Sequence, residues 1–240
     1  MDMTNTTDSA SNASAVSALL AMFYEPSRAF AMLEPKRHAW LPLLLLIVSV
    51  IALMAWYFMI VDFSWLLDQM LASMKPEQRE QAKGMMTKSM LQTTTLVSTV
   101  VMYPAFCALA GLYFMIVGKS MNKNVDFGTG FALSAWASVP GLLMLPLGAV
   151  AIVIASGGQL GFSELNPLSI NQLIFHHDMN HPMAGVLDSI SVTSVWTMFL
   201  TVLGFQVWAK VPRSTAVKVV LIPYVIIYGL WLAYALSKAA

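Results

Sequence analysis

The sequence contains few charged residues and almost no cysteine. Only 10% of its 240 residues are Asp, Glu, Lys or Arg, whereas an average soluble domain has roughly 25%, so the charges are too few to cover a water-soluble globule. The single cysteine, Cys107, excludes an intramolecular disulfide framework and a thiolate metal cluster. A formal net charge of +1 supplies none of the basic surface typical of nucleic-acid binding, and we expect no nucleic-acid partner.

The sequence also lacks the motifs of common enzyme active sites. The nucleophile motif GxSxG, the Walker-type phosphate loop and GxGxxG are all absent. The long apolar runs contain no Asp or Glu, although intramembrane carboxylates normally mark proton and cation pathways. We therefore expect no enzymatic activity, no catalytic residues, no cofactor and no coupling to ion flow.

Long apolar runs, in contrast, are abundant. Five runs of 19 to 26 residues hold 113 residues and contain one charge, Lys218. Each is near the roughly 20 residues that span a bilayer, and a charge at the centre of a span costs roughly 2.5–3.5 kcal/mol. The sequence therefore predicts an all-α membrane protein, a bundle of five transmembrane helices with amphipathic interfacial helices. The expected spans are residues 40–61, 93–117, 131–156, 190–208 and 216–236, within a bundle domain of residues 40–237.

An amphipathic segment, residues 15–39, leads into the first span. Residues 1–14 before it are small and polar and predict a disordered tail. The segment itself predicts two short helices, which either lie in the lipid headgroup region or pack as a cytoplasmic cap on the bundle. Its first apolar stripe, at helical spacing, consists of Val16, Leu19, Leu20 and Phe23.

The distribution of Lys and Arg predicts the orientation in the membrane. Lys36 and Arg37 immediately precede the first span, and the short loops 118–130 and 209–215 are basic. The long segment 157–189 has neither Lys nor Arg, as is typical of an outside loop. We expect an integral membrane protein with its N-terminus in the cytoplasm and its C-terminus outside, in the inner membrane if the protein is bacterial.

Aromatic residues and proline mark the limits of the first span and of the segment after it. Trp40 and the pair Trp56-Tyr57 flank the first span, as expected for interfacial anchors. In residues 62–92 two helical patterns are separated by Lys75-Pro76, because proline opens a new first turn. This segment predicts a helical hairpin on the outer surface.

The third span contains two prolines, which predict a broken helix. Each proline removes one backbone hydrogen bond, and a break at membrane depth persists only where protein or water satisfies the freed groups. The candidate residues for this break are Ser134, Ser138, Pro140 and Pro146. Such a break would suit an alternative function, a small permease or lipid transporter.

One loop gathers residues of the kind that bind metals: His176, His177, Asp178 and His181. His177 and His181 have the i, i+4 spacing of helical zinc sites, but the glutamate of HExxH, the general base of metalloproteases, is missing. We expect a solvated polar loop without metal. A weak metal site, and with it a metal-dependent enzyme, is the alternative.

A short N-terminal motif resembles that of a known family. The stretch PSRAFAMLEP fits the pattern P-x-x-A-F-x-x-L-x-P, with Pro26, Phe30, Leu33 and Pro35 at its fixed positions. Together with the five spans, it resembles the Yip family, the Ypt/Rab-interacting membrane proteins, and most of all their prokaryotic members. The resemblance covers roughly residues 15–236 and implies a five-span helical bundle without enzymatic activity.

The eukaryotic branch of this family binds prenylated small GTPases and organises membrane. Its D-L-Y-G-P element has no match here, where the nearest stretch is Phe23-Tyr24-Glu25-Pro26, and this departure counts against small-GTPase binding. We expect a non-enzymatic membrane scaffold or adaptor. Its expected partners are the lipid bilayer and other membrane or peripheral proteins, bound through the amphipathic segment and a face of the bundle.

Overall fold

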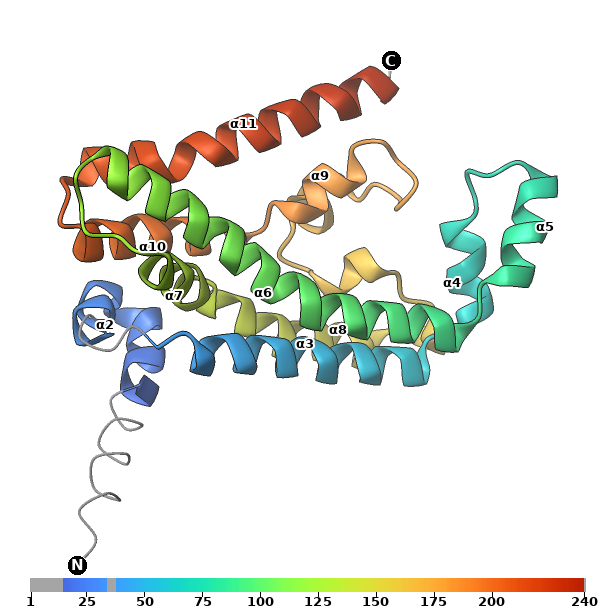
Figure 1. The fold of residues 1–240 in the computed structure, drawn as a ribbon. Coiled ribbons are helices and arrows are strands. Elements are labelled where there is room, and N and C mark those ends of the chain that lie inside the picture. The colour runs from blue at the N-terminus through green and yellow to red at the C-terminus, as the bar shows by residue number, and fades with distance from the viewer. Residues whose placement is uncertain (1–14, 34–37, 240) are drawn as a thin grey trace, which may run out of the picture. The chain divides into compact units, whose positions relative to one another are not determined.

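The computed structural model describes residues 15–33 and 38–239 (Figure 1). Within these ranges the chain is almost entirely helical, and its only strand-like feature is an isolated antiparallel bridge between Ser169 and Ser191. The predicted tail at 1–14 and the residues Pro35, Lys36 and Arg37 lie outside the described residues.

Five segments of the described chain are long and apolar enough to cross a membrane. The predicted all-α membrane bundle is therefore confirmed. The third segment is discontinuous and comprises two α-helices joined by a short 3₁₀ helix. The segments are α3 (Trp40–Ile60), α6 (Lys88–Ser120), α7 (Phe127–Ala137) with η1 (Val139–Leu143) and α8 (Met144–Ile154), α10 (Val192–Ala209) and α11 (Arg213–Ala239).

Helix α6 begins five residues before the predicted second span, and at its start the Thr87 hydroxyl accepts from the Met90 amide at 3.1 Å. The hydroxyl of Thr95 donates to the Leu91 carbonyl at 2.8 Å, and Thr99 donates to the Thr95 carbonyl at 2.9 Å. Each hydroxyl thus bonds to its own helix one turn back, which lets a polar run continue as helix. Shorter helices fill the connections: Ala15–Tyr24, α2 (Pro26–Leu33), α4 (Phe63–Met70), α5 (Pro76–Met85), η2 (Ser156–Gly158), η3 (Phe162–Leu165), the π-helix η4 (Asn171–Phe175) and α9 (Ala184–Ser189).

The chain forms two compact units, and the first consists of Met1–Leu46, Tyr103–Gly141 and Trp196–Pro223. In this unit α6 and α7 approach closely where two glycines meet. A Cβ on Gly130 would lie 2.8 Å from the Gly111 carbonyl oxygen, so this contact between backbones depends on small residues, as is common between membrane helices.

The second unit consists of Ile47–Met102, Leu142–Val195 and Tyr224–Ala240. Its core includes Tyr57, which is fully buried and donates its hydroxyl to the Leu160 carbonyl at 2.7 Å. The expectation that Tyr57 is an interfacial anchor is therefore wrong, whereas Trp56 beside it is exposed. The buried members of this core are Leu53, Tyr57, Phe58, Val61, Leu66, Ile152, Leu160 and Leu165.

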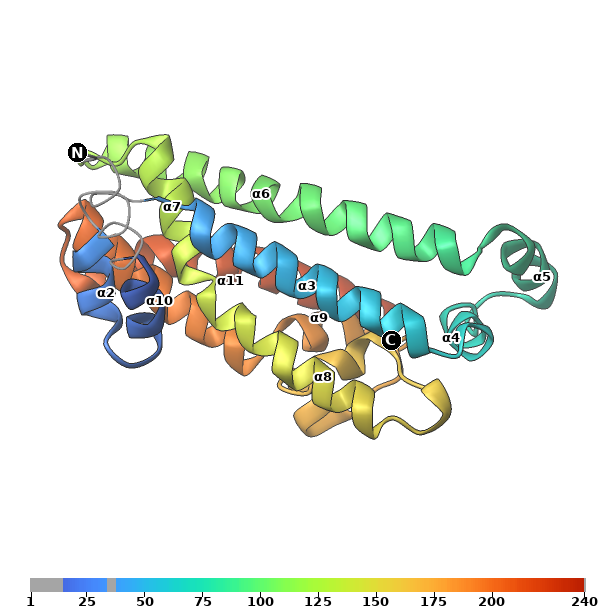
Figure 2. The same cartoon turned by 90° about the horizontal axis from the view of Figure 1, so that it is seen from below.

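A helical hairpin follows α3, as the sequence predicts. Helices α4 and α5 lie beyond the C-terminal end of α3 and the N-terminal end of α6 in both views (Figures 1 and 2). Arg79 on α5 donates to the Ala72 carbonyl at 2.7 Å, and Lys83 forms an ion pair with Asp68 at 2.6 Å. These contacts fasten the second helix of the hairpin to the first.

Asp62 caps the first turn of α4. Its Oδ1 accepts from the Ser64 hydroxyl at 2.6 Å and from the backbone N–H groups of Ser64 and Trp65 at 3.0 and 3.1 Å. The hydrogen bond from the Ser64 hydroxyl, followed by the one from the Trp65 amide, holds the pKa of the Asp62 carboxyl below its ordinary value.

The lowered pKa predicts how the stability of this cap depends on pH. Because folding favours the ionised carboxylate, the cap stabilises α4 fully above the unfolded pKa of about 3.9, and this contribution is lost as pH falls through the lower folded pKa. We expect Asp62→Ala to lower Tm at pH 6 and the difference from wild type to shrink progressively below about pH 4. Thermal denaturation in detergent measures this, with Glu77→Ala as the control; a difference constant over that range would contradict it.

Candidate functional site

The N-terminal motif packs its aromatic residue against α10. Phe30 is fully buried, and its ring meets that of Trp208 edge to face, with centroids 5.5 Å apart and planes at 87°. The indole N–H of Trp208 also donates to the Phe30 carbonyl at 2.8 Å. Trp208 of α10 therefore contacts both the side chain and the backbone of Phe30. Leu33 is also buried, one turn further along α2.

A glycine on α10 makes room for this packing. A Cβ placed on Gly204 would lie 2.6 Å from Cε1 of Phe30 and would also meet Cδ1 of Leu133. Sequence reasoning missed both Gly204 and Trp208. Their spacing of four residues puts them on one helix face, but only the fold shows that α2 lies against that face.

Pro26 begins α2 directly after the preceding helix. The Glu25 amide still donates to the Ala21 carbonyl at 2.7 Å, so the first helix is complete when Pro26 opens the next one, a position where proline costs no hydrogen bond. An exposed ion pair joins Arg28 to Glu25 at 2.9 Å, and pairs of this kind contribute little to stability. The fourth motif residue, Pro35, lies outside the described residues.

The helix Ala15–Tyr24 has two apolar faces rather than the single stripe that was predicted. Its inner face is buried and consists of small residues and Met22, with Phe23 meeting Trp196 at a centroid distance of 5.5 Å. The alanines on this face allow close packing, whereas the larger residues Val16 and Leu20 lie on the outer face. The outer row is Val16, Leu20 and Tyr24, with exposed fractions of 49, 57 and 68%.

The third membrane-length segment is interrupted around Pro140. Helix α7 ends at Ala137, and the chain passes through η1, which contains Pro140, before α8 begins at Met144. The Ser138 hydroxyl and amide both bond to the Ser134 carbonyl, at 2.8 and 3.2 Å. The hydroxyl of Ser138 thus hydrogen-bonds to a backbone carbonyl one turn earlier in the same segment.

The second proline of this span does not break it. Pro146 lies within the first turn of α8, where a missing N–H removes no helical hydrogen bond. The break is therefore confined to the segment around Pro140. Beside it, the indole N–H of the fully buried Trp136 donates to the His38 carbonyl at 2.6 Å, which ties α7 to a residue two positions before α3.

The histidine loop is not helical, so the expected shared helix face of His177 and His181 is wrong. Their rings instead stack with centroids 3.7 Å apart and planes at 9°. The π-helix ends at His176, whose φ of 55° is left-handed and turns the chain away from helix. The buried amide of Asn171 then fixes the next residue, because it donates to the His177 carbonyl and accepts from the His177 amide, both at 3.0 Å.

The histidine side chains are arranged for packing and backbone contacts. Nδ1 of His181 accepts from the Met183 amide at 3.2 Å, and His176 is exposed. Within the described ranges no three His, Cys, Asp or Glu residues form a group that could hold a metal ion. The i, i+4 spacing does not put His177 and His181 on one helix face, because Pro182 and the left-handed His176 keep these residues out of a helix.

Comparison with known protein families identifies the family of this chain. The model of the family described as Yip1 domain matches residues 20–235, nearly the whole of the chain that the structure describes. No curated protein and no solved structure matches the chain.

Proposed function

The chain belongs to the Yip1 domain family, and on this basis we propose that it is a non-enzymatic scaffold or adaptor of the membrane. It binds protein partners and organises the lipid around them. As an integral multi-pass protein of this family it has five membrane-length helices, whose outward apolar residues are in contact with lipid. Of the described chain outside these helices, the amphipathic helices before α3 are the part to which we assign partner binding.

The observation that carries this proposal is the two-faced helix Ala15–Tyr24. Its inner face is packed within the first unit, and the Phe30–Trp208 contact holds the following helix in place. Its outer row of three large apolar side chains remains exposed outside the membrane-length helices. Single exposed apolar residues are ordinary, but a row along one helix face is typical of an interaction surface.

We also propose that the N-terminus is cytoplasmic and the C-terminus lies outside, in the inner membrane if the protein is bacterial. The basic loops between α6 and α7 and between α10 and α11 support this orientation, because cytoplasmic loops are enriched in Lys and Arg. The Nζ of Lys123 in the first loop donates to the Lys210 carbonyl in the second at 3.4 Å. The two basic loops therefore meet at one end of their unit.

Substituting the outer row tests the proposed function. We expect the triple variant Val16→Ser, Leu20→Ser, Tyr24→Ser to recover partners from crosslinked membranes about tenfold less well, which corresponds to about 1.4 kcal/mol of binding. Its Tm should hardly change, since surface substitutions usually alter stability by less than about 0.5 kcal/mol.

Two exposed methionines of the α4–α5 hairpin provide the matched control. The variant Met74→Ser, Met85→Ser removes a similar apolar surface elsewhere outside the membrane-length helices and should recover partners as wild type does. Equal recovery by the triple variant and wild type, or an equal loss in the control, would contradict the proposed role of this helix.

A further inference from the structure

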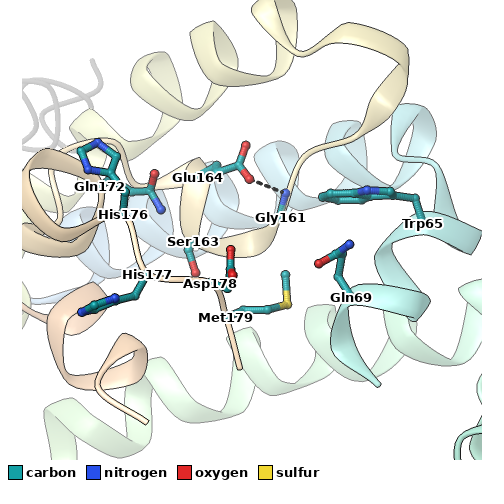
Figure 3. Close-up of a pocket in the computed structure, with 10 residues that line it drawn as sticks. All are labelled: Trp65, Gln69, Gly161, Ser163, Glu164, Gln172, His176, His177, Asp178 and Met179. Carbon is teal, nitrogen blue, oxygen red and sulfur yellow. Dashed lines mark hydrogen bonds between the residues drawn. The ribbon is translucent and has the colours of Figure 1, made fainter. Parts of the chain in front are cut away.

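A small polar cavity lies in the second unit between α4 and the loops that follow α8 (Figure 3). Trp65 and Gln69 reach it from α4, and its other residues belong to the segment 161–179. Its volume of about 180 Å³ is below the roughly 300–1,000 Å³ of pockets for drug-sized ligands. The cavity therefore suits a small chemical group.

Hydrogen bonds between the two walls hold the cavity open. The side-chain amide of Asn180 donates to the Gln69 carbonyl at 2.7 Å, which joins the histidine loop to α4. At the start of α4, the Asp62 amide donates to the Gly158 carbonyl at 2.9 Å, and the Asp62 carboxylate fixes the amide of Trp65. Both walls are thus fastened without a ligand, and the site is preorganised.

The lining of the cavity is acidic. Glu164 and Asp178 both line it, no Lys or Arg is among its lining residues, and none occurs anywhere in 157–189. The Glu164 carboxylate accepts only a long bond, 3.3 Å, from the Gly161 amide. The nearby cations of the hairpin are engaged elsewhere, Lys83 with Asp68 and Arg79 with backbone carbonyls.

A third carboxylate, that of Asp188, is hydrogen-bonded to a residue that lines the cavity. Ser163 lines the cavity and donates its hydroxyl to Oδ2 of Asp188 at 2.7 Å. The other oxygen, Oδ1 of Asp188, is buried and has no hydrogen-bond partner within the described part of the chain. This carboxylate adds to the negative charge beside the cavity wall.

An aromatic ring makes the site suitable for an organic cation. Trp65 presents its indole at the side of the cavity opposite the histidine loop (Figure 3), and the face of an indole is the strongest cation–π partner among side chains. An aromatic ring combined with carboxylates favours an ammonium group. The positive charge of the ammonium is attracted by the carboxylates, and its C–H or N–H groups can pack against the ring. Since α4 begins three residues after the membrane-length helix α3 ends, the cavity lies next to the end of this helix, where we expect the lipid headgroups.

We propose that this cavity binds the ammonium group of a small amine or of an amine-bearing lipid headgroup. The charge comes from Glu164 and Asp178, the aromatic wall from Trp65, and an amide contact from Gln69. This site is independent of the outer row of the N-terminal helix, so either proposal can fail without the other.

The test uses the full-length chain in nanodiscs of phosphatidylglycerol, a lipid without an amine. Ethanolamine is titrated calorimetrically at constant ionic strength, with sodium chloride as the blank. In a second arm, nanodiscs of mixed phosphatidylethanolamine and phosphatidylglycerol are studied by native mass spectrometry for the lipid retained. The variants are Trp65→Leu and the double variant Glu164→Gln, Asp178→Asn. The matched control is Glu77→Gln, an exposed carboxylate on α5.

We expect saturable ethanolamine binding that falls at least tenfold in both variants and is unchanged in the control, while Trp65→Phe retains most of it. If free ethanolamine does not bind but phosphatidylethanolamine is retained and lost in the variants, the ammonium comes from a lipid headgroup. Three results would overturn the proposal. Neither ethanolamine nor phosphatidylethanolamine binds, phosphatidylglycerol is retained in preference to phosphatidylethanolamine, or binding is insensitive to the double variant. Unchanged Tm values establish that the variants are folded.

Discussion

Replacing Phe30 by alanine is expected to lower the free energy of unfolding by about 3–5 kcal/mol, the usual cost of removing a buried phenylalanine. The ring is fully buried, contacts Trp208 edge to face and fills the space that Gly204 leaves. For a chain of this size the loss corresponds to a fall in Tm of roughly 6–20 °C. Thermal denaturation of the detergent-solubilised protein measures it.

Two further variants separate this packing from a general effect of substitution. Gly204→Val introduces branched carbon atoms into the space of the Phe30 ring, and we expect a loss of at least about 1–3 kcal/mol, the usual cost of overpacking. Tyr24→Ala, on the exposed outer row, should change stability by less than about 0.5 kcal/mol. A Tm for Phe30→Ala equal to that of Tyr24→Ala would show that the motif does not hold α2 in place.

The sequence was sufficient to predict a membrane protein, because the hydrocarbon core of a bilayer requires long helices with few charges. The two prolines of the third span indicated an interruption, which the structure has at Pro140, whereas Pro146 lies in the first turn of α8, so the effect of a proline depends on its position in the helix. Helix α6 shows the limit of this reasoning, because it begins at Lys88, before the apolar run, and the threonine hydroxyls that follow bond within the helix.

Contacts between distant segments were not predictable in the same way. The motif pattern singled out Phe30, but Gly204 and Trp208 became meaningful only once α10 was seen to pack against α2. The loop 157–189 has no helical or strand periodicity, and its shape depends on single polar side chains such as Asn171. The i, i+4 spacing of its histidines was therefore misleading, and the role of the broken span in transport stays a prediction.

Tyr57 illustrates the same limit and leads to the second large prediction. An aromatic residue near the end of a span is usually an interfacial anchor, but here the hydroxyl of Tyr57 donates to the Leu160 carbonyl and its ring packs against Phe58 and Phe162. Leu160 directly precedes Gly161 in the cavity wall. Tyr57 therefore connects α3 to the segment that shapes the cavity.

We expect Tyr57→Ala to lower the free energy of unfolding by about 3–5 kcal/mol, the range for a large buried aromatic residue. Tyr57→Phe keeps the ring but leaves the Leu160 carbonyl without its donor, so its cost should be about 1–3 kcal/mol. The difference between the two variants separates packing from hydrogen bonding. Thermal denaturation measures both, and hydrogen exchange of residues 160–165 should increase in each variant.

Met59, two residues along the same helix, provides the control because its side chain is largely exposed. Met59→Ala should leave Tm and hydrogen exchange of residues 160–165 near wild type, since it removes no contact within the core. If Tyr57→Phe behaves as Met59→Ala does, the carbonyl of Leu160 finds another donor and the wall of the cavity does not depend on this hydroxyl. If it behaves as predicted, one hydrogen bond from a membrane-length helix positions the segment that carries Gly161 and Glu164.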